Sequence, residues 1–306
     1  MSQKIVFMGT PEFSVPTLET LINSNHKVLA VYSQPASKAN RGQKLIQSSV
    51  EAFATEHSLN IRTPSSLDND EEFNFMKKLK PDIVVVIAYG KIIPKKFLNL
   101  AKYGFINIHA SLLPKWRGAA PIQRSIMNLD NQTGISIMKI VEKLDSGPVM
   151  HQDKIQINEK INTFDLSKIL SKIAASSIIN SLNKIERGDA KFKEQDHRQA
   201  TYAKKISKSE GKINWNKSAR TVLAKINGLN PNPGAWFEYK KDRFKVWKAE
   251  IVNKNSEAGE IIDDKILIAC KEKAIKILEI QKEGKSRQSI DKFLLGNKIK
   301  KGEIIN

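Results

Sequence analysis

The chain has 306 residues, a formal net charge of +19 and 40% hydrophobic residues, a length that can bury a sizeable core and favours two domains over one. The longest aliphatic run, Ile83 to Ala88, is too short to span a bilayer, and the first residues lack the long apolar segment of a signal peptide. Cys270 is the single cysteine, which excludes an intrachain disulfide and leaves no cysteine cluster for zinc, so we expect a cytoplasmic protein without a metal site.

The positive charge has two readings. It favours a polyanionic partner, most plausibly nucleic acid. However, 42 of the 51 basic residues are lysines, and Ile and Asn are abundant. That skew is also typical of an AT-rich genome, so the alternative reading is that part of the charge reflects genome composition rather than function.

The first half alternates strand-like and helix-like segments. Apolar runs predict strands at Ile5–Met8, Val28–Tyr32, Ile83–Ala88, Phe105–His109 and Ile135–Ile140. Helical patterns lie between them at Val15–Ser24, Ser48–His57, Asp70–Leu79 and Pro121–Asn128. This alternation is typical of βαβ units and predicts an α/β domain with a mainly parallel sheet.

The second half begins with a helical pattern from Thr163 to about Arg187, which Thr163 can cap and Gly188 ends. Residues 190–207 are polar without sustained periodicity and are predicted to be a linker. Short strands are then predicted at Gly234–Tyr239, Phe244–Ile251, Gly259–Asp263, Lys265–Cys270 and Ala274–Gln281. A run of short strands indicates a small β-barrel, so we expect domains at 1–189 and 208–306.

The most informative segment runs from Asn107 to Pro114. On a strand, Asn107 and His109 point to the same face, while Ile106 and Ile108 point to the other. Pro114 cannot continue a central strand, so an amide and an imidazole emerge together near a strand end, where open α/β sheets bind ligands. Asp145, in the segment Leu144-Asp145-Ser146-Gly147-Pro148, could orient and charge that imidazole, although Asp-Ser-Gly is also ordinary turn chemistry.

An amide, an imidazole and a carboxylate suit acyl transfer, in which a carbonyl oxygen gains negative charge. The segments 107–114 and 144–148 resemble the active-site signature of enzymes that transfer formyl from 10-formyltetrahydrofolate. Further similar motifs follow in order along the chain, at residues 7–13, 88–94, 115–122, 202–206, 228–231 and 233–236. Within the family, the chain most resembles the members that act on methionyl-tRNA.

The resemblance implies a Rossmann-like formyltransferase domain followed by an OB-like barrel that binds tRNA. It implies transfer of formyl from 10-formyltetrahydrofolate to the amino group of initiator methionyl-tRNA, without a metal or a covalent enzyme intermediate. Asn107 would donate to the oxyanion, and His109 would donate as well and shuttle the proton, oriented by Asp145. Which group finally moves the proton stays open, with a water as one candidate. We expect the enzyme to be a monomer.

The resemblance also assigns the two substrates. The folate would lie along Ser111, Leu112, Leu113 and Pro114. The pterin pocket would be formed by Ile87, Ala88, Tyr89, Gly90, Ile140, Val141 and Glu142, which without the resemblance read as core and turn. By resemblance, the loop Gln34 to Lys44 would enter the acceptor end of the tRNA, with Arg41 as the residue that matches the family and Lys38 and Lys44 beside it. On charge alone, Lys204 and Lys205 of the second domain could meet tRNA phosphates, and a solvated face explains these lysines equally well.

Two positions depart from the family pattern. In the early loop, only the flanks of Gln34 to Gly42 match, which leaves the tRNA contacts of this loop open. Asn232 stands where the family usually has Trp.

Other functions compete with this reading. A sibling formyltransferase would act on glycinamide ribonucleotide or on a nucleotide-linked amino sugar, and a 10-formyltetrahydrofolate hydrolase would share the same site. A non-catalytic RNA-binding protein would need no intact set of Asn107, His109 and Asp145.

Overall fold

The computed structural model of the chain describes residues 2–39 and 44–305. The chain forms two compact units, and neither is continuous in sequence. The first comprises Met1–Ala119, Gly134–Ile155 and Ser167–Ala203. The second comprises Ala120–Thr133, Gln156–Leu166 and Lys204–Asn306.

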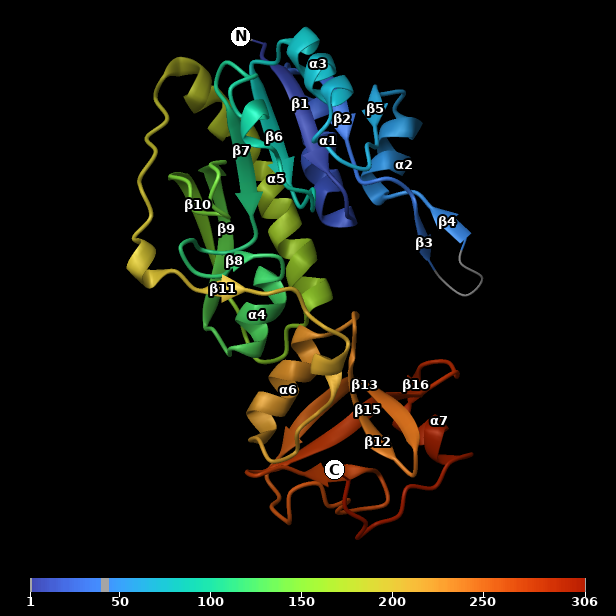
Figure 1. Cartoon of the computed structure of the whole chain (residues 1–306). Helices are drawn as coiled ribbons and strands as arrows, with labels where there is room; N and C mark the ends of the chain where they lie inside the picture. The colour runs from blue at the N-terminus through green and yellow to red at the C-terminus, as the bar shows by residue number, and fades with distance from the viewer. Residues whose placement is uncertain (1, 40–43, 306) are drawn as a thin grey trace. The chain divides into compact units, whose positions relative to one another are not determined.

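The first unit is built on a seven-stranded sheet in the order β10-β9-β7-β6-β1-β2-β5 (Figure 1). Its strands are β1 Lys4–Gly9, β2 Lys27–Tyr32, β5 Ile61–Arg62, β6 Ile83–Ile87, β7 Phe105–His109, β9 Gln132–Lys139 and β10 Val149–Gln156. The pairs from β5 through β7 are parallel, and β7 pairs with β9 antiparallel. All five residues of β6 are buried, as expected for a central parallel strand.

Helices accompany this sheet, and Figure 1 shows α5 running along it. They are α1 Val15–Ile22, α2 Ser49–Glu56, α3 Asp70–Leu79 and α5 Thr163–Arg187. The starts of two helices follow from their capping residues, since the Ser48 side chain accepts from Glu51 N (2.9 Å) and Asn69 Oδ1 accepts from Glu72 N (2.8 Å). The prediction of an α/β fold with a mainly parallel sheet is confirmed.

Residues 190–203 are ordered within the first unit, although the sequence predicts that they belong to a linker. Two short strands, β8 Arg117–Gly118 and β11 Tyr202–Ala203, pair in parallel there. Gln195 is 8% exposed. A polar segment without periodicity can therefore be held in place by specific hydrogen bonds. A hydrophobic pattern does not predict such bonds. A short hairpin of β3 Ser37–Ala39 and β4 Lys44–Ile46 lies earlier in the same unit.

The second unit holds a separate antiparallel sheet in the order β12-β13-β15-β14, with β16 pairing with β15. Its strands are β12 Ala235–Tyr239, β13 Asp242–Val252, β14 Leu267–Ala269, β15 Ala274–Lys282 and β16 Gln288–Ser289. The helices α4 Pro121–Met127, α6 Ala219–Gly228 and α7 Ile290–Leu294 also belong to it. Its core joins residues of α6, such as Ile226, to the inner face of the sheet, where Phe237 and Phe244 stack.

The longer predicted elements are mostly found, while the short strands β3, β4, β5, β8, β11 and β16 and the short helix α7 were not predicted. Three larger differences need correction. The predicted strand Gly259–Asp263 is wrong, because this segment makes isolated bridges only, at Glu260 and Ile261. The strand β10 was missed: it lies at the sheet edge and most of its residues are half-exposed, so it has no apolar run. The helix α6 was also missed, although Ser218 caps it and its buried residues include Val222, Leu223 and Ile226.

Candidate active site

The site begins at the carboxyl end of β7, between β6 and β9. Ile106 and Ile108 are buried in the sheet, while Asn107 is half-buried and His109 is 6% exposed on the other face. This placement follows from the alternation of side chains along a strand. Two polar groups are thus held on a rigid element directly before the chain leaves the sheet.

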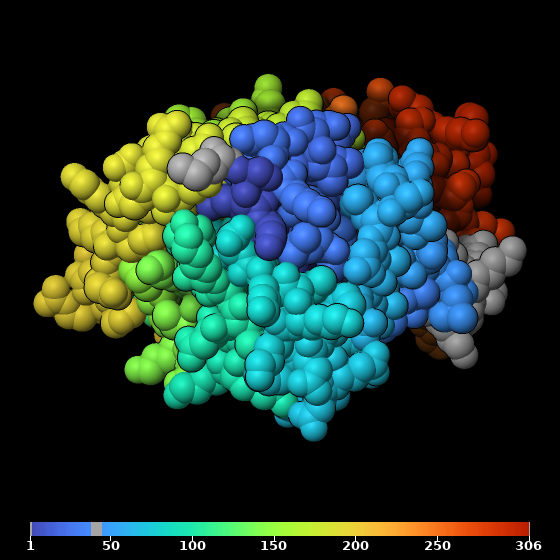
Figure 2. All heavy atoms as spheres, turned by 90° about the horizontal axis from the view of Figure 1, so that it is seen from above, coloured from blue at the N-terminus to red at the C-terminus, as the bar shows by residue number. Residues whose placement is uncertain are grey.

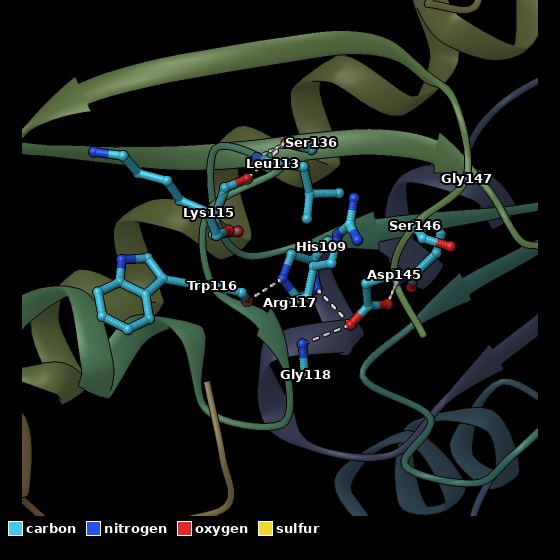
Figure 3. A network of polar contacts seen from close by, with 12 residues as sticks. His109, Leu113, Lys115, Trp116, Arg117, Gly118, Ser136, Asp145, Ser146 and Gly147 are labelled. Carbon is cyan, nitrogen blue, oxygen red and sulfur yellow. Dashed lines mark hydrogen bonds and ion pairs between the residues drawn. The ribbon is translucent and has the colours of Figure 1, made fainter. Parts of the chain in front are cut away.

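His109 has a different partner at each ring nitrogen (Figure 3). Its Nε2 lies 2.8 Å from the carbonyl oxygen of Trp116, and its Nδ1 lies 3.7 Å from Oδ2 of Asp145. Because a carbonyl oxygen can only accept, Nε2 carries a proton in this arrangement. The Nδ1 position then decides between the neutral ring and the imidazolium, and it faces the carboxylate.

Asp145 reaches the site from the loop between β9 and β10. Its Oδ2 accepts from the backbone N–H of Gly118 at 2.8 Å, and its Oδ1 lies 3.5 Å from Nδ2 of Asn107. Asp145 adopts a left-handed conformation with φ of 45°. Gly147 is required in the same turn, because a Cβ there would overlap the carbonyl oxygen of Lys139. The three predicted catalytic residues are therefore brought together by two segments, β7 and the loop between β9 and β10, and a third segment contributes the Gly118 N–H.

The segment after β7 is fixed by Ser136 of β9. Ser136 Oγ donates to Ser111 O (2.6 Å) and accepts from Leu113 N (3.0 Å). Ser111 Oγ donates to the carbonyl oxygen of Lys115 (2.6 Å), and Gln152 Nε2 donates to Leu113 O (3.0 Å). Ser111 and Leu113 are buried, Leu112 is half-buried and the Leu113–Pro114 bond is cis. The predicted folate segment is thus a rigid loop directly beside His109.

The other predicted folate residues fall into two groups. Ile87 and Tyr89 are buried, whereas Ala88 and Gly90 are exposed and have positive φ. The Tyr89 carbonyl oxygen accepts from Thr10 Oγ1 (2.8 Å) and from Gln34 Nε2 (2.9 Å), which holds this turn.

Ile140 packs against the hydrophobic cluster that contains Tyr89, so the two groups meet in one part of the first unit. Val141 and Glu142 are exposed, and Glu142 pairs with Lys95 at 2.8 Å. The exposed members are free to contact a ligand, while Ile87 and Tyr89 act as core.

The first unit also has a hollow of about 860 Å³ beside this loop. Segments 95–105, 139–142 and 185–192 line it, and Figure 2 looks onto the end of the unit where the teal residues near 100 and the yellow residues near 190 meet. Its lining shares Ile140, Val141 and Glu142 with the predicted pterin pocket but does not include His109. The geometry around His109, rather than cavity size, therefore defines the candidate site.

The predicted tRNA residues belong to two segments of the chain. Arg41 lies outside the described residues, and Lys38 and Lys44 lie on β3 and β4. Lys204 and Lys205 are exposed and follow β11.

Sequence reasoning missed the backbone partners of the site, which are the Gly118 N–H and the Trp116 carbonyl group. Both groups lie in the motif 115–122, but the residue type does not indicate which partner a backbone group will bind. Among residues 2–39 and 44–305, no group of three or more His, Cys, Asp or Glu side chains could hold a metal ion. No helix within those ranges is long and apolar enough to cross a membrane.

Comparison with known proteins places this geometry in a family. The formyl transferase family model matches residues 3–182, and the model of the formyl transferase C-terminal domain matches residues 205–298. The chain belongs to the formyl transferase family. It is 53% identical over 307 residues to the methionyl-tRNA formyltransferase of Pelagibacter ubique, covering 100% of this chain and 99% of that protein. It is 42% identical over 312 residues to the protein of the same name from Coxiella burnetii, with the same coverage.

Solved structures of other proteins share the fold. HypX of Aquifex aeolicus in complex with tetrahydrofolic acid has a TM-score of 0.69 at 15% identity, over 100% of this chain and 51% of that protein. An N-formyltransferase of Helicobacter canadensis, in complex with folinic acid and dTDP-3-aminofucose, has a TM-score of 0.69 at 17% identity, over 92% of this chain and 100% of that one. At these identities the likeness concerns the fold alone.

Proposed function

We propose that this chain transfers the formyl group of 10-formyltetrahydrofolate to the amino group of initiator methionyl-tRNA. The observation that carries the proposal is the convergence of Asn107, His109 and Asp145 in a chain that matches relatives of that name from end to end. The net charge of +19 supports a polyanionic substrate over a small amine.

The folate loop supports the co-substrate. The exposed turn at Ala88 and Gly90, the exposed residues Val141 and Glu142, and the fixed loop at Leu112–Pro114 offer apolar surface and backbone polar groups in the same unit as the catalytic side chains. Apolar surface combined with backbone polar groups fits a flat heterocycle with polar edges. When bound, 10-formyltetrahydrofolate supplies an electrophilic formyl carbon and a leaving nitrogen.

The residues of the chain then have distinct duties. The Asn107 amide has two N–H donors, of which one is directed toward Asp145, so the other remains to stabilise the oxygen of the attacked formyl group. His109, held by Trp116 O at Nε2, presents Nδ1 toward Asp145 and can hold or release a proton there. Asp145, at 3.7 Å from Nδ1, would orient the imidazole ring.

The finer parts of the proposal concern the molecule as a whole. Residues 1–189 would form the catalytic domain and 208–306 the tRNA-binding domain, and residues 190–207 would connect them, with 190–203 packed within the first unit. The enzyme would act as a monomer in the cytoplasm, where its substrates are. Light scattering at assay concentration tests the monomer.

A substrate assay tests the proposal directly. The purified chain is incubated with 10-formyltetrahydrofolate and, in parallel, with initiator methionyl-tRNA, glycinamide ribonucleotide and a nucleotide-linked amino sugar. We expect formylation of the tRNA at a kcat/KM at least about a hundredfold above that for either small amine. Efficient formylation of a small amine without activity on the tRNA would replace this proposal by a sibling enzyme.

A further inference from the structure

The main chain of Asp145 is held in place by a side chain that no sequence motif points to. Gln195 Nε2 donates to the carbonyl oxygen of Asp145 (2.9 Å) and to that of Gly147 (2.7 Å). One amide group therefore spans the turn that places the carboxylate. The support is needed because Asp145 has a φ of 45°, a backbone conformation that residues other than Gly rarely adopt.

The other end of the Gln195 amide is held by Arg117. Arg117 donates to Gln195 Oε1 from Nε (3.1 Å) and from Nη2 (2.8 Å). Because a guanidinium can only donate, the amide oxygen must face Arg117 and the amide nitrogen must face the two carbonyl groups. The orientation of the Gln195 side chain is thus fixed by chemistry and does not depend on the placement of its O and N atoms.

Arg117 is in turn fixed within β8. It is 4% exposed, and its Nη2 also lies 2.8 Å from Nδ1 of His197, which must accept. The next residue, Gly118, donates its backbone N–H to the carboxylate of Asp145. The dipeptide Arg117–Gly118 therefore holds Asp145 twice, directly at the side chain and through Gln195 at the main chain.

We propose that Gln195 is a positioning residue for Asp145, with Arg117 as its anchor, a role that rests on the proposed function of Asn107, His109 and Asp145. The gaps between Asp145 and its two polar neighbours are 3.7 Å to His109 and 3.5 Å to Asn107. The position of the turn therefore sets both distances. Segment 190–203 thereby acts as a brace for the catalytic carboxylate.

Gln195→Glu tests this role with the least change in shape. The variant keeps an acceptor for Arg117 but loses the donor to the two carbonyl groups. We expect kcat to fall by about tenfold to a hundredfold, while KM for both substrates changes by less than about twofold. The matched control is Gln199→Glu, an exposed glutamine of the same segment, which should retain wild-type kcat.

Two further measurements separate positioning from mere stability. Gln195→Met removes the donor without adding charge, and its kcat should fall as well, with the enzyme folded at assay temperature. In an Asp145→Asn background, adding Gln195→Glu should change kcat by less than about twofold, because the residue acts through Asp145. Multiplicative losses in the double variant, or wild-type kcat in both single variants, would overturn the proposal.

A spectroscopic readout keeps this test independent of the substrate. The ¹⁵N imidazole signals of His109, assigned by their loss in His109→Ala, should shift in Gln195→Glu and stay in place in Gln199→Glu. Unshifted signals in Gln195→Glu would overturn the positioning role. If the wild-type chain fails to formylate methionyl-tRNA, the proposed function fails, while this comparison still decides the role of Gln195.

Discussion

At the scale of single residues, Asp145 is the point where the contacts of the candidate site meet. Its strongest contact is the backbone N–H of Gly118 at 2.8 Å, whereas the His109 ring lies 3.7 Å away. His109, in turn, makes its shorter contact to the Trp116 carbonyl group. Backbone groups of the loop after β7 therefore orient both ionisable residues, which leaves Asn107 with a donor for the substrate.

The first prediction removes the two donors of the site. His109→Ala and Asn107→Ala should each lower kcat by about a hundredfold or more, as expected for loss of an acid–base group or an oxyanion donor. His151→Ala is the matched control, because His151 is also paired with a carboxylate, at 2.9 Å from Asp153, on an edge strand of the same unit. Wild-type kcat in either site variant would contradict the assignment.

The second prediction concerns Cys270, which is 1% exposed in the core of the second unit. Burial raises the pKa of its thiol to about 12, so the reactive thiolate is scarce at neutral pH. We expect no reaction with a thiol reagent such as DTNB at pH 8 in the native protein, and one equivalent after unfolding in guanidinium chloride. Rapid labelling of the native chain would contradict this burial.

At the scale of elements, the turn between β9 and β10 shows how backbone geometry places a functional group. Gly147 allows the turn to pass against the carbonyl oxygen of Lys139, and Asp145 adopts its left-handed conformation two residues earlier. The turn depends on the absence of one Cβ, so a very small change should disturb the site.

Gly147→Ala should therefore lower both stability and activity. The added Cβ forces the turn away from β9, at a cost of about 1–3 kcal/mol, and moves Asp145 with it. Gly296→Ala is the control, since a Cβ there meets nothing within 4 Å and its φ is not positive. Thermal unfolding and kcat are measured on both variants. Equal unfolding temperatures and equal kcat values for the two variants would contradict the predicted overlap of a Cβ at Gly147 with the Lys139 carbonyl oxygen.

The elements that sequence could predict are those that bury a continuous or periodic apolar face. The strands β6 and β7 are such runs, and their ends were found to within a residue. The half-exposed edge strand β10 and the contacts of segment 190–203 depend on pairing partners far away in the chain, so no local pattern reveals them. The same holds for the site: residue types suggested Asn107 and His109, and left Asp145 as either their partner or a turn residue, a choice that only the family resemblance decided.

A pH dependence is expected at helix α4. Arg124 donates to Glu210 from Nη1 (2.7 Å), and this hydrogen bond holds the pKa of the Glu210 carboxyl below its usual value of 4.5. A carboxyl group whose pKa is lower in the folded state stabilises the fold at pH values above its unfolded-state pKa. This contribution is lost as the pH falls through its folded-state pKa.

Glu210→Gln should therefore lower the unfolding temperature at pH 7, and the difference from wild type should shrink as pH falls below about 4.5. Glu257→Gln, at an exposed position in the same unit, serves as the control and should leave the unfolding temperature unchanged. A difference between Glu210→Gln and wild type that is independent of pH would contradict the ionic origin of the effect.

At the scale of the whole molecule, the two compact units do not follow the order of the chain. The second unit includes residues 120–133 and 156–166, and it buries Thr163, whose Oγ1 donates to Gly228 O at 2.6 Å. Asn227 Nδ2 likewise donates to Glu159 O at 2.8 Å. Deleting residues 208–306 would remove the partners of these segments. Formyl transfer and tRNA binding are therefore better tested separately by point substitutions than by truncation.

The last prediction tests where the positive charge acts. If Lys204 and Lys205 meet tRNA phosphates, each contact releases counterions and contributes roughly 0.7–0.9 to the slope of log K against log salt. Replacing both residues by Ala should lower the slope for methionyl-tRNA by about 1.5 and raise KM at fixed salt, with kcat nearly unchanged. Replacing the exposed Lys300 and Lys301 by Ala changes the net charge of +19 by the same amount and serves as the control. If the two double variants lose equal slope, the charge acts diffusely over the molecule. A selective loss at Lys204 and Lys205 would instead mark the residues after β11 as a tRNA contact.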